Sequence, residues 1–175
     1  PLYLAVDGEL IGVIGIEDPL KAGVREAIAD LRMLGFKRVV MLTGDGERTA
    51  ARIADAAGVT EYRANLLPED KYAFVERLKA EGSKVVMVGD GVNDAPALKA
   101  ADIGVAMGIT GTDVAKDASD MILMDDRFTT IVYAVREGRR VFRNIQKVVS
   151  FLVADNVAQI VVLLTAVALN WNAPL

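Results

Sequence analysis

The sequence contains no cysteine and no histidine. Their absence excludes disulfide bonds, thiol nucleophiles, imidazole bases and the usual ligands of zinc and other soft metals. Any chemistry must therefore depend on carboxylates, hydroxyls, lysine and backbone amides. With 20 basic and 24 acidic residues, the chain also lacks the positive charge that is typical of nucleic-acid binders, so no nucleic-acid partner is expected.

A length of 175 residues fits one domain with at most one appendage. The content of hydrophobic residues, 53%, and of charged residues, 25%, is that of a globular protein. The mean hydropathy of +0.32 is nevertheless high for a soluble domain. Its source is local, because residues 148–169 contain no Lys, Arg, Glu, Gly or Pro. These 22 residues are long enough for about one bilayer crossing.

A basic segment precedes this apolar run. Residues 127–147 carry six basic side chains and one acidic side chain. Basic flanks of membrane helices lie on the cytoplasmic side, so we expect residues 1–147 to be cytoplasmic. The predicted organisation is a head at 1–126, a basic stalk helix over 127–147, a transmembrane helix over 148–169 and the start of an extracytoplasmic loop at 170–175.

Short apolar stretches alternate along the chain with segments of helical periodicity. The predicted strands cover residues 2–6, 9–16, 38–42, 62–64, 84–88, 103–106 and 121–123. The predicted helices cover residues 24–34, 47–57, 68–81, 93–100, 112–118 and the region from 128 onwards. The Asp-Gly pair at 7–8 predicts a hairpin, and the later alternation indicates a doubly wound, mostly parallel α/β sheet. In such a sheet a site lies at the carboxyl ends of the strands.

The sequence Val-Gly-Asp-Gly-Val-Asn-Asp-Ala-Pro-Ala at 88–97 follows a predicted buried strand and opens a helix. Gly89 and Gly91 permit tight backbone geometry, while Asp90 and Asp94 place two hard oxygen donors beside one crevice. Carboxylates can face a phosphate only with a cation between them, so the pattern predicts a Mg²⁺ site. The alternative is a plain strand-to-helix turn with a capping Asp or Asn.

Two further segments carry groups that suit a phosphate. Thr-Gly-Asp at 43–45 ends another predicted strand and offers a hydroxyl and backbone amides, although it could also be an ordinary capped turn. Lys71 lies in the first turn of a predicted helix, where a cation opposes the helix dipole. It is therefore expected to pair with a phosphate or a carboxylate, unless it is a solvated surface lysine.

Three polar residues, Asp155, Asn156 and Gln159, interrupt the apolar run at offsets that put them on one helical face. Polar groups inside a membrane are costly, so an ion path is the functional interpretation. The alternatives are hydrogen bonding between helices and a shorter membrane span that begins after Asp155.

The order Thr, Lys, Gly-Asp-Gly-x-x-Asp on a βαβ frame resembles the haloacid dehalogenase superfamily. The strings at 43–45 and 89–98 resemble the phosphorylation domain of a P-type cation-transporting ATPase. The resemblance implies an aspartyl phosphate, formed from ATP on the Asp of an Asp-Lys-Thr-Gly-Thr motif. This sequence has no such motif. We therefore expect this chain to be the C-terminal part of that domain together with the membrane helix that follows it. We expect the chain alone to have no catalytic activity.

The resemblance implies that the cofactors are Mg²⁺ and ATP and assigns roles around the metal. Asp90 would ligate Mg²⁺, Asp94 would support it, and Asn93 would contact phosphate. The implied partners are the transported cation, the lipid bilayer and the rest of a multi-pass pump. That remainder comprises nucleotide-binding and actuator domains and other membrane helices.

The resemblance also assigns roles around the phosphoryl group. Thr43 and Gly44 would hold its oxygens, and Lys71 would neutralise its charge. Asp45 would face the nucleotide, and Asp18, before a proline, matches an acidic position near the nucleotide.

The sequence leaves open which subclass of pump the chain resembles and whether it is part of a pump at all. Residues 6–42 resemble the heavy-metal pumps, whereas residues 108–147 resemble the calcium and sodium/potassium pumps. Calcium-type pumps carry an Asn and, three residues later, a Glu in the matching helix, but here Gln159 follows Asn156. Two alternatives are a soluble phosphatase of the same superfamily, which would need its own nucleophilic Asp, and an inactive regulatory head.

Overall fold

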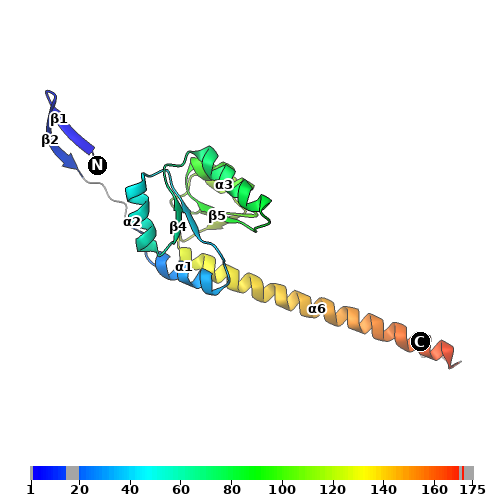
Figure 1. The fold of residues 1–175 in the computed structure, drawn as a ribbon. Helices are drawn as coiled ribbons and strands as arrows, with labels where there is room; N and C mark the ends of the chain where they lie inside the picture. The colour runs from blue at the N-terminus through cyan, green and yellow to red at the C-terminus, as the bar shows by residue number, and fades with distance from the viewer. Residues whose placement is uncertain (1, 15–19, 170, 172–175) are drawn as a thin grey trace. The chain divides into compact units, whose positions relative to one another are not determined.

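The computed structural model describes residues 2–14, 20–169 and 171 of the chain. The chain forms two compact units, Pro1–Val132 and Tyr133–Leu175. The strands are β1 (Leu2–Val6), β2 (Glu9–Ile14), β3 (Val40–Leu42), β4 (Glu61–Arg63), β5 (Val86–Gly89), β6 (Ile103–Met107) and β7 (Met121–Leu123) (Figure 1). The helices are α1 (Val24–Met33), α2 (Glu47–Ala57), α3 (Pro68–Ala80), the short 3₁₀ turn η1 (Val92–Asp94), α4 (Ala95–Ala100), α5 (Asp113–Asp117) and α6 (Phe128–Ala168).

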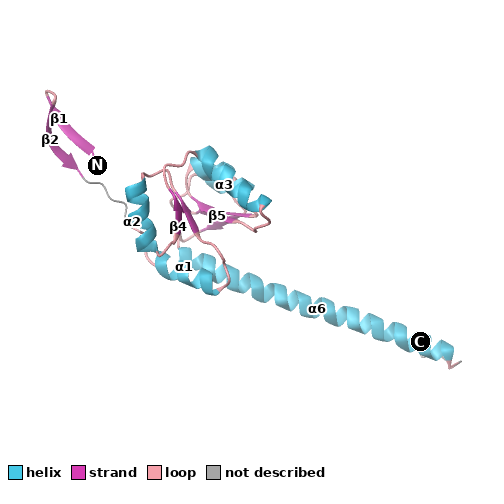
Figure 2. Ribbon diagram, viewed as in Figure 1, coloured by secondary structure: helices cyan, strands magenta, loops and turns pink. Residues whose placement is uncertain are grey.

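The strands of the first unit, apart from β1 and β2, pair in parallel. β3 pairs with β4, and β5, β6 and β7 form a three-stranded sheet in that order. Helices follow the strands in sequence and lie on the outside of this unit (Figure 2). The predicted α/β fold with parallel strands is confirmed, and the carboxyl ends of β3 and β5 carry the predicted site loops.

Two apolar clusters among the described residues stabilise the first unit. The larger lies between β5 and β6 and the helices α3, α4 and α5, and its buried members are Val75, Val85, Met87, Ala97, Leu98, Ala106 and Ala115. The smaller joins α1 and α2 through Val24, Ile28 and Ala57, with Phe128 from the start of α6 packed against it. The larger cluster thus supports the loop that follows β5.

Burial along β5 alternates, as a strand requires. Val85, which directly precedes β5, and Met87 are buried, whereas Val86 between them is exposed. The prediction of a buried strand over residues 84–88 is therefore wrong at Val86. The predicted helix over 93–100 begins as the 3₁₀ turn η1 and continues as α4, because the Asp94 side chain accepts backbone amides of the preceding loop.

β1 and β2 form the predicted antiparallel hairpin. Its turn residues, Asp7 and Gly8, have φ values of 50° and 85°, which are the left-handed values of a two-residue hairpin turn. Most of the large apolar side chains of this hairpin are exposed, Tyr3, Leu10 and Ile11 among them.

α6 is a single helix of 41 residues that begins at Phe128. It includes the basic segment and the apolar run without a break, as predicted (Figure 1). Among the described residues it is the one helix that is long and apolar enough to cross a bilayer, judged by length and composition.

Candidate functional site

The loop after β5 is organised around the buried carboxylate of Asp94, whose residue is 8% exposed. Asp94 Oδ2 accepts the backbone N–H of Gly91 at 3.1 Å and that of Asp90 at 3.3 Å. Asp94 Oδ1 accepts a hydrogen bond from Lys71 Nζ at 2.7 Å. Both oxygens are therefore engaged, and Asp94 fixes the path of the loop from inside.

Gly89 is the position where this loop tolerates no side chain. A Cβ atom at Gly89 would lie 2.6 Å from Asp94 Cβ and 2.9 Å from Asp94 Cγ. Real Cβ atoms do not approach so closely, so the loop can close over the Asp94 carboxylate only with glycine here. Contact with Asp94 thus explains why position 89, which the sequence pattern singled out, requires glycine.

Asp90 has an exposed side chain, while its main chain is fixed from two sides. Its N–H donates to Asp94 Oδ2, and its carbonyl accepts the N–H of Thr112 at 2.8 Å. The main chain of Asp90 is thus held at both its N–H and its carbonyl, while its carboxylate is accessible to solvent.

This donor set suits Mg²⁺. No group of three acidic, His or Cys side chains gathers into a metal cage within the described part of the chain. Mg²⁺ needs no such cage, because it is typically held by one or two carboxylates together with phosphate oxygens and waters. Since both oxygens of Asp94 are occupied by Lys71 and backbone amides, the geometry favours Asp90 as the direct ligand and Asp94 as its support.

The loop after β3 is held differently. The Thr43 hydroxyl donates to Asp45 Oδ2 at 2.9 Å, and the Asp45 N–H donates to Thr43 Oγ1 at 3.1 Å. Asp45 and Gly44 are exposed, and Thr43 is half-buried. The predicted phosphate-binding hydroxyl is thus engaged by its own neighbour, and a phosphate oxygen at Thr43 would have to replace the Asp45 carboxylate.

Hydrogen bonds connect the two loops through the start of α3. The Thr43 carbonyl accepts the N–H of Leu66 at 3.0 Å, and the Asp45 carbonyl accepts the N–H of Asn65 at 2.8 Å. α3 begins two residues after Leu66 and carries Lys71, which reaches Asp94. The three segments that sequence reasoning singled out therefore form one connected arrangement.

Two predicted residues contribute less to this arrangement. Asn93 lies exposed in η1, next to Asp94 in the chain. Asp18 lies outside the described residues.

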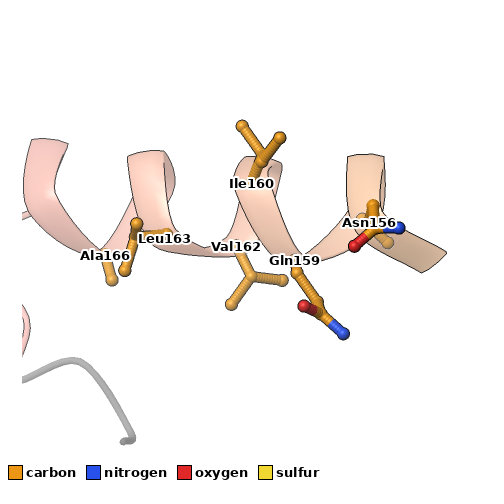
Figure 3. Close-up of a pocket in the computed structure, with 7 residues that line it drawn as sticks. Asn156, Gln159, Ile160, Val162, Leu163 and Ala166 are labelled. Atoms are coloured by element: carbon orange, nitrogen blue, oxygen red, sulfur yellow. The ribbon is translucent and has the colours of Figure 1, made fainter. Parts of the chain in front are cut away.

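The polar residues of α6 are exposed and bonded within the helix. Asn156 Nδ2 donates to the Leu152 carbonyl at 2.8 Å, and Gln159 Nε2 donates to Asp155 Oδ2 at 3.0 Å. A shallow concave patch on α6 includes Asn156, Gln159, Leu163 and Ala166, but Asp155 does not line it (Figure 3).

Comparison with known proteins identifies the family. The model of the haloacid dehalogenase-like hydrolases matches residues 2–102, and a second model of the same description matches residues 71–135. The chain belongs to the haloacid dehalogenase-like hydrolase family. The matched ranges include both candidate loops and Lys71, so the site described above lies in the part of the chain that defines the family.

Curated relatives within this family are P-type ATPases. The chain is 45% identical over 205 residues to the P-type sodium-transporting ATPase4 of Toxoplasma gondii, which covers 95% of this chain and 15% of the relative. It is 43% identical to the calcium-transporting ATPase 1 of Bacillus cereus, over 94% of this chain and 22% of the relative. The chain therefore spans roughly a fifth of the length of these relatives.

A solved structure agrees with the sequence relatives. A zinc-transporting PIB-type ATPase in the E2·Pi state superposes with a TM-score of 0.73 and is 42% identical, covering 83% of this chain and 23% of that protein. The prediction of a haloacid dehalogenase-like fold related to P-type ATPases is confirmed. Calcium, sodium and zinc transporters all occur among the similar proteins, so similarity to both subclasses matches the mixed pattern of the sequence.

Sequence reasoning missed two residues that make long-range contacts in this part of the chain. Thr112 holds the Asp90 carbonyl, and its hydroxyl also accepts the N–H of Ala115 as the N-cap of α5. A Thr before a helix is a visible capping signal, but nothing local reveals its long-range contact. The second is Asp126, whose carboxylate binds a loop 16 to 17 residues earlier.

Proposed function

We propose that this chain is part of an ATP-driven P-type cation pump and supplies its Mg²⁺ and phosphate-binding residues. The observation that carries the proposal is that the buried Asp94–Lys71 pair holds the main chain of Asp90, whose exposed carboxylate lies at the carboxyl end of β5. The phosphorylated Asp would belong to a part of the polypeptide outside residues 1–175. The chain alone is therefore expected to be inactive.

Each residue of the site would have a separate role in phosphoryl transfer, which depends on its position. Mg²⁺, held by Asp90 with Asp94 behind it, would offset negative charge on the phosphoryl group. Lys71 uses one of its three N–H donors on Asp94, which leaves donors that can face phosphoryl oxygens. The Thr43 hydroxyl and the Gly44 backbone amide would bind further oxygens, and Asn93 would contact the phosphate. Catalysis then rests on positioning and electrostatics.

The proposed partners follow from the same reading. ATP would approach the Asp45 side of the site, with Asp18 near the nucleotide, and other domains of the same pump would cover the head. Residues 148–169 of α6 would cross the bilayer, and residues 1–147 would be cytoplasmic. Asp155, Asn156 and Gln159 are the proposed ion-path residues.

A soluble phosphatase or a purely regulatory head is not favoured, because the curated relatives are cation pumps and α6 continues from the head into an apolar run.

The test is acid-stable labelling of the full-length protein by ATP that carries radioactive phosphorus at the γ-position, with a panel of cations. The proposal expects Mg²⁺-dependent labelling that one class of cation stimulates. Absence of labelled protein under every cation would contradict it. Mg²⁺-dependent p-nitrophenyl phosphate hydrolysis by residues 1–175 that survives purification would contradict the expected inactivity of the chain alone.

A further inference from the structure

Asp126 lies between β7 and the start of α6 and has a left-handed backbone with φ of 52°. Its side chain is only 9% exposed. Asp126 Oδ1 accepts the N–H of Ile109 at 2.9 Å, and Oδ2 accepts the N–H and the hydroxyl of Thr110 at 2.8 and 2.7 Å. One carboxylate thus clasps two consecutive residues of the loop that follows β6.

A cation completes this clasp. Lys21 Nζ lies 3.7 Å from Asp126 Oδ2 and donates to Thr110 Oγ1 at 3.1 Å. Burial alone would raise the pKa of Asp126, but the hydrogen bonds from Ile109 and Thr110 and the charge of Lys21 outweigh it and hold the pKa well below its usual range. Asp126 is therefore ionised near neutral pH.

The clasped loop leads directly to the metal site. It begins at Gly108, whose N–H donates to the Leu123 carbonyl at 2.9 Å and where a Cβ would lie 2.6 Å from that oxygen. It passes through Gly111, where a Cβ would collide with the Met107 carbonyl. It ends at Thr112, whose N–H holds the carbonyl of Asp90 at 2.8 Å. The loop is closely packed at both glycines, so its anchors determine its path.

We propose that Asp126 is a positioning residue for the phosphoryl site, because it clasps the loop Gly108–Thr112, whose last residue fixes the main chain of Asp90. The inference rests on the proposed function only in taking Asp90 as the Mg²⁺ ligand. Asp126 touches neither the metal nor the phosphate. It acts through Thr112, and it does so from the segment that starts α6.

The neighbouring residue offers a matched control. Asp125 accepts the Thr130 hydroxyl at 2.7 Å and the Arg127 N–H at 3.2 Å, so it caps the start of α6. These bonds stay within the α6 segment and do not reach the loop after β6. Replacement of Asp125 by Asn therefore removes the same charge one position earlier without loosening the clasp.

The first experiment measures amide hydrogen exchange by NMR on residues 1–175 in detergent micelles. In Asp126→Asn a single amide oxygen replaces two carboxylate oxygens, so Ile109 or Thr110 loses its acceptor. We expect the Thr112 amide to exchange about fivefold faster or more, with Asp125→Asn unchanged. A Thr112 rate that stays at the wild-type value would overturn the proposal. A rise shared equally by the β6 amides would do the same, because it would show global destabilisation.

The second experiment titrates Mg²⁺ into the same samples and follows the Gly91 amide resonance. The half-saturating Mg²⁺ concentration should rise about threefold or more in Asp126→Asn and stay unchanged in Asp125→Asn. Thr110→Ala removes only the hydrogen bond of the hydroxyl, so it should give a smaller rise in the half-saturating concentration. This variant replaces Asp126→Asn in the test if Asp126→Asn does not fold. An unchanged half-saturation in both Asp126→Asn and Thr110→Ala would refute a role at the metal. Failure of ATP labelling in the full-length protein would contradict the pump but leave these two results intact.

Discussion

The loops after β5 and β3 lie at the same ends of parallel strands, yet different forces hold them. The loop after β5 closes around a buried carboxylate that a lysine from α3 neutralises. The loop after β3 is exposed, and its Thr43 and Asp45 side chains bond mainly to each other. The first loop is fixed before any ligand arrives, whereas the second can exchange an internal hydrogen bond for one to a phosphate oxygen.

This difference indicates how the work is divided between them. A metal ligand must keep its position while charges around it change, and the main chain of Asp90, the proposed ligand, is held by Asp94 and Thr112. Gly89 leaves the space that the Asp94 side chain fills. A loop that binds and releases a phosphoryl group instead needs side chains that can exchange one hydrogen-bond partner for another. Variants of the β5 loop should therefore affect stability and activity more strongly than variants of the β3 loop.

The largest effect is expected from Asp90→Asn in the full-length protein. Loss of the charged ligand should lower phosphoprotein formation by about a thousandfold or more, because charge stabilisation is the main catalytic term. The exposed side chain adds little to the fold, so the free energy of unfolding should change by less than about 0.5 kcal/mol. Asp113→Asn, which removes an exposed carboxylate on α5, is the control and should retain labelling. Normal labelling of the Asp90 variant would contradict the assignment.

Two Lys–Asp ion pairs have similar N–O distances but differ in exposure, so they show the effect of burial on the strength of an ion pair. Lys71 lies 2.7 Å from Asp94 and its side chain is 14% exposed, whereas Lys84 lies 2.8 Å from Asp102 and is 88% exposed. Lys71→Met should cost about 3 kcal/mol of unfolding free energy, since it leaves a buried carboxylate without its cation. Lys84→Met should leave the melting temperature almost unchanged. Equal losses in the two variants would show that burial does not set the strength of the pair.

Gly89→Ala tests whether close packing against Asp94 holds the loop after β5. Its Cβ would meet Asp94, and the resulting strain should cost about 1–3 kcal/mol in chemical denaturation. Gly138→Ala in α6 is the matched control, because a Cβ there meets nothing within 4 Å. That control should be neutral or stabilising by about 0.5–1 kcal/mol. A Gly89 variant as stable as Gly138→Ala would mean that the loop is not held as described.

Thr43→Val should have a smaller effect on stability, because the hydrogen bond to Asp45 is exposed. We expect a loss of about 1 kcal/mol or less of unfolding free energy. Phosphoprotein formation should fall by about tenfold to a hundredfold, as the hydroxyl is lost. A stability loss as large as that of Lys71→Met would remove the distinction between the two loops.

The smallest effect concerns acid stability and compares wild type with Asp126→Asn. Because hydrogen bonds lower the pKa of Asp126 in the folded state, its charged form stabilises the fold above the unfolded pKa of about 3.9. This contribution is lost as the pH falls below that value. The difference in melting temperature should thus be constant from about pH 5 to 8 and shrink below about pH 4. A difference that grows on acidification would have the wrong sign.

The local pattern predicted most of the fold because most elements carry their own signals. α2 ends at Gly58, which has φ of 72° and donates to the Ala54 and Asp55 carbonyls, and such glycine stops are visible in sequence. β7 and the start of α6 were also predicted at their observed positions. The burial expected of the strand at 84–88 was wrong at Val86, because apolar composition does not reveal which side of a strand a helix covers.

The candidate site was predictable as a set of residues but not as a set of contacts. Asp90, Asp94 and Lys71 stand out by motif and by helix position. The hydrogen bond from Lys71 to Asp94 joins positions 23 apart, and periodicity carries no information on such pairs. The contact between Thr112 and Asp90 and the clasp of Asp126 are invisible for the same reason.

The central claim is that Asp90, held by the loop after β5, binds a divalent cation. The most direct measurement is a titration of residues 1–175 with Mn²⁺, which stands in for Mg²⁺, followed by paramagnetic broadening of the amide resonances. We expect the Asp90 and Gly91 resonances to broaden first in the wild type and the resonances of residues 90 and 91 to keep their widths at the same Mn²⁺ concentration in Asp90→Asn. Equal broadening of these resonances in both proteins would contradict the central claim.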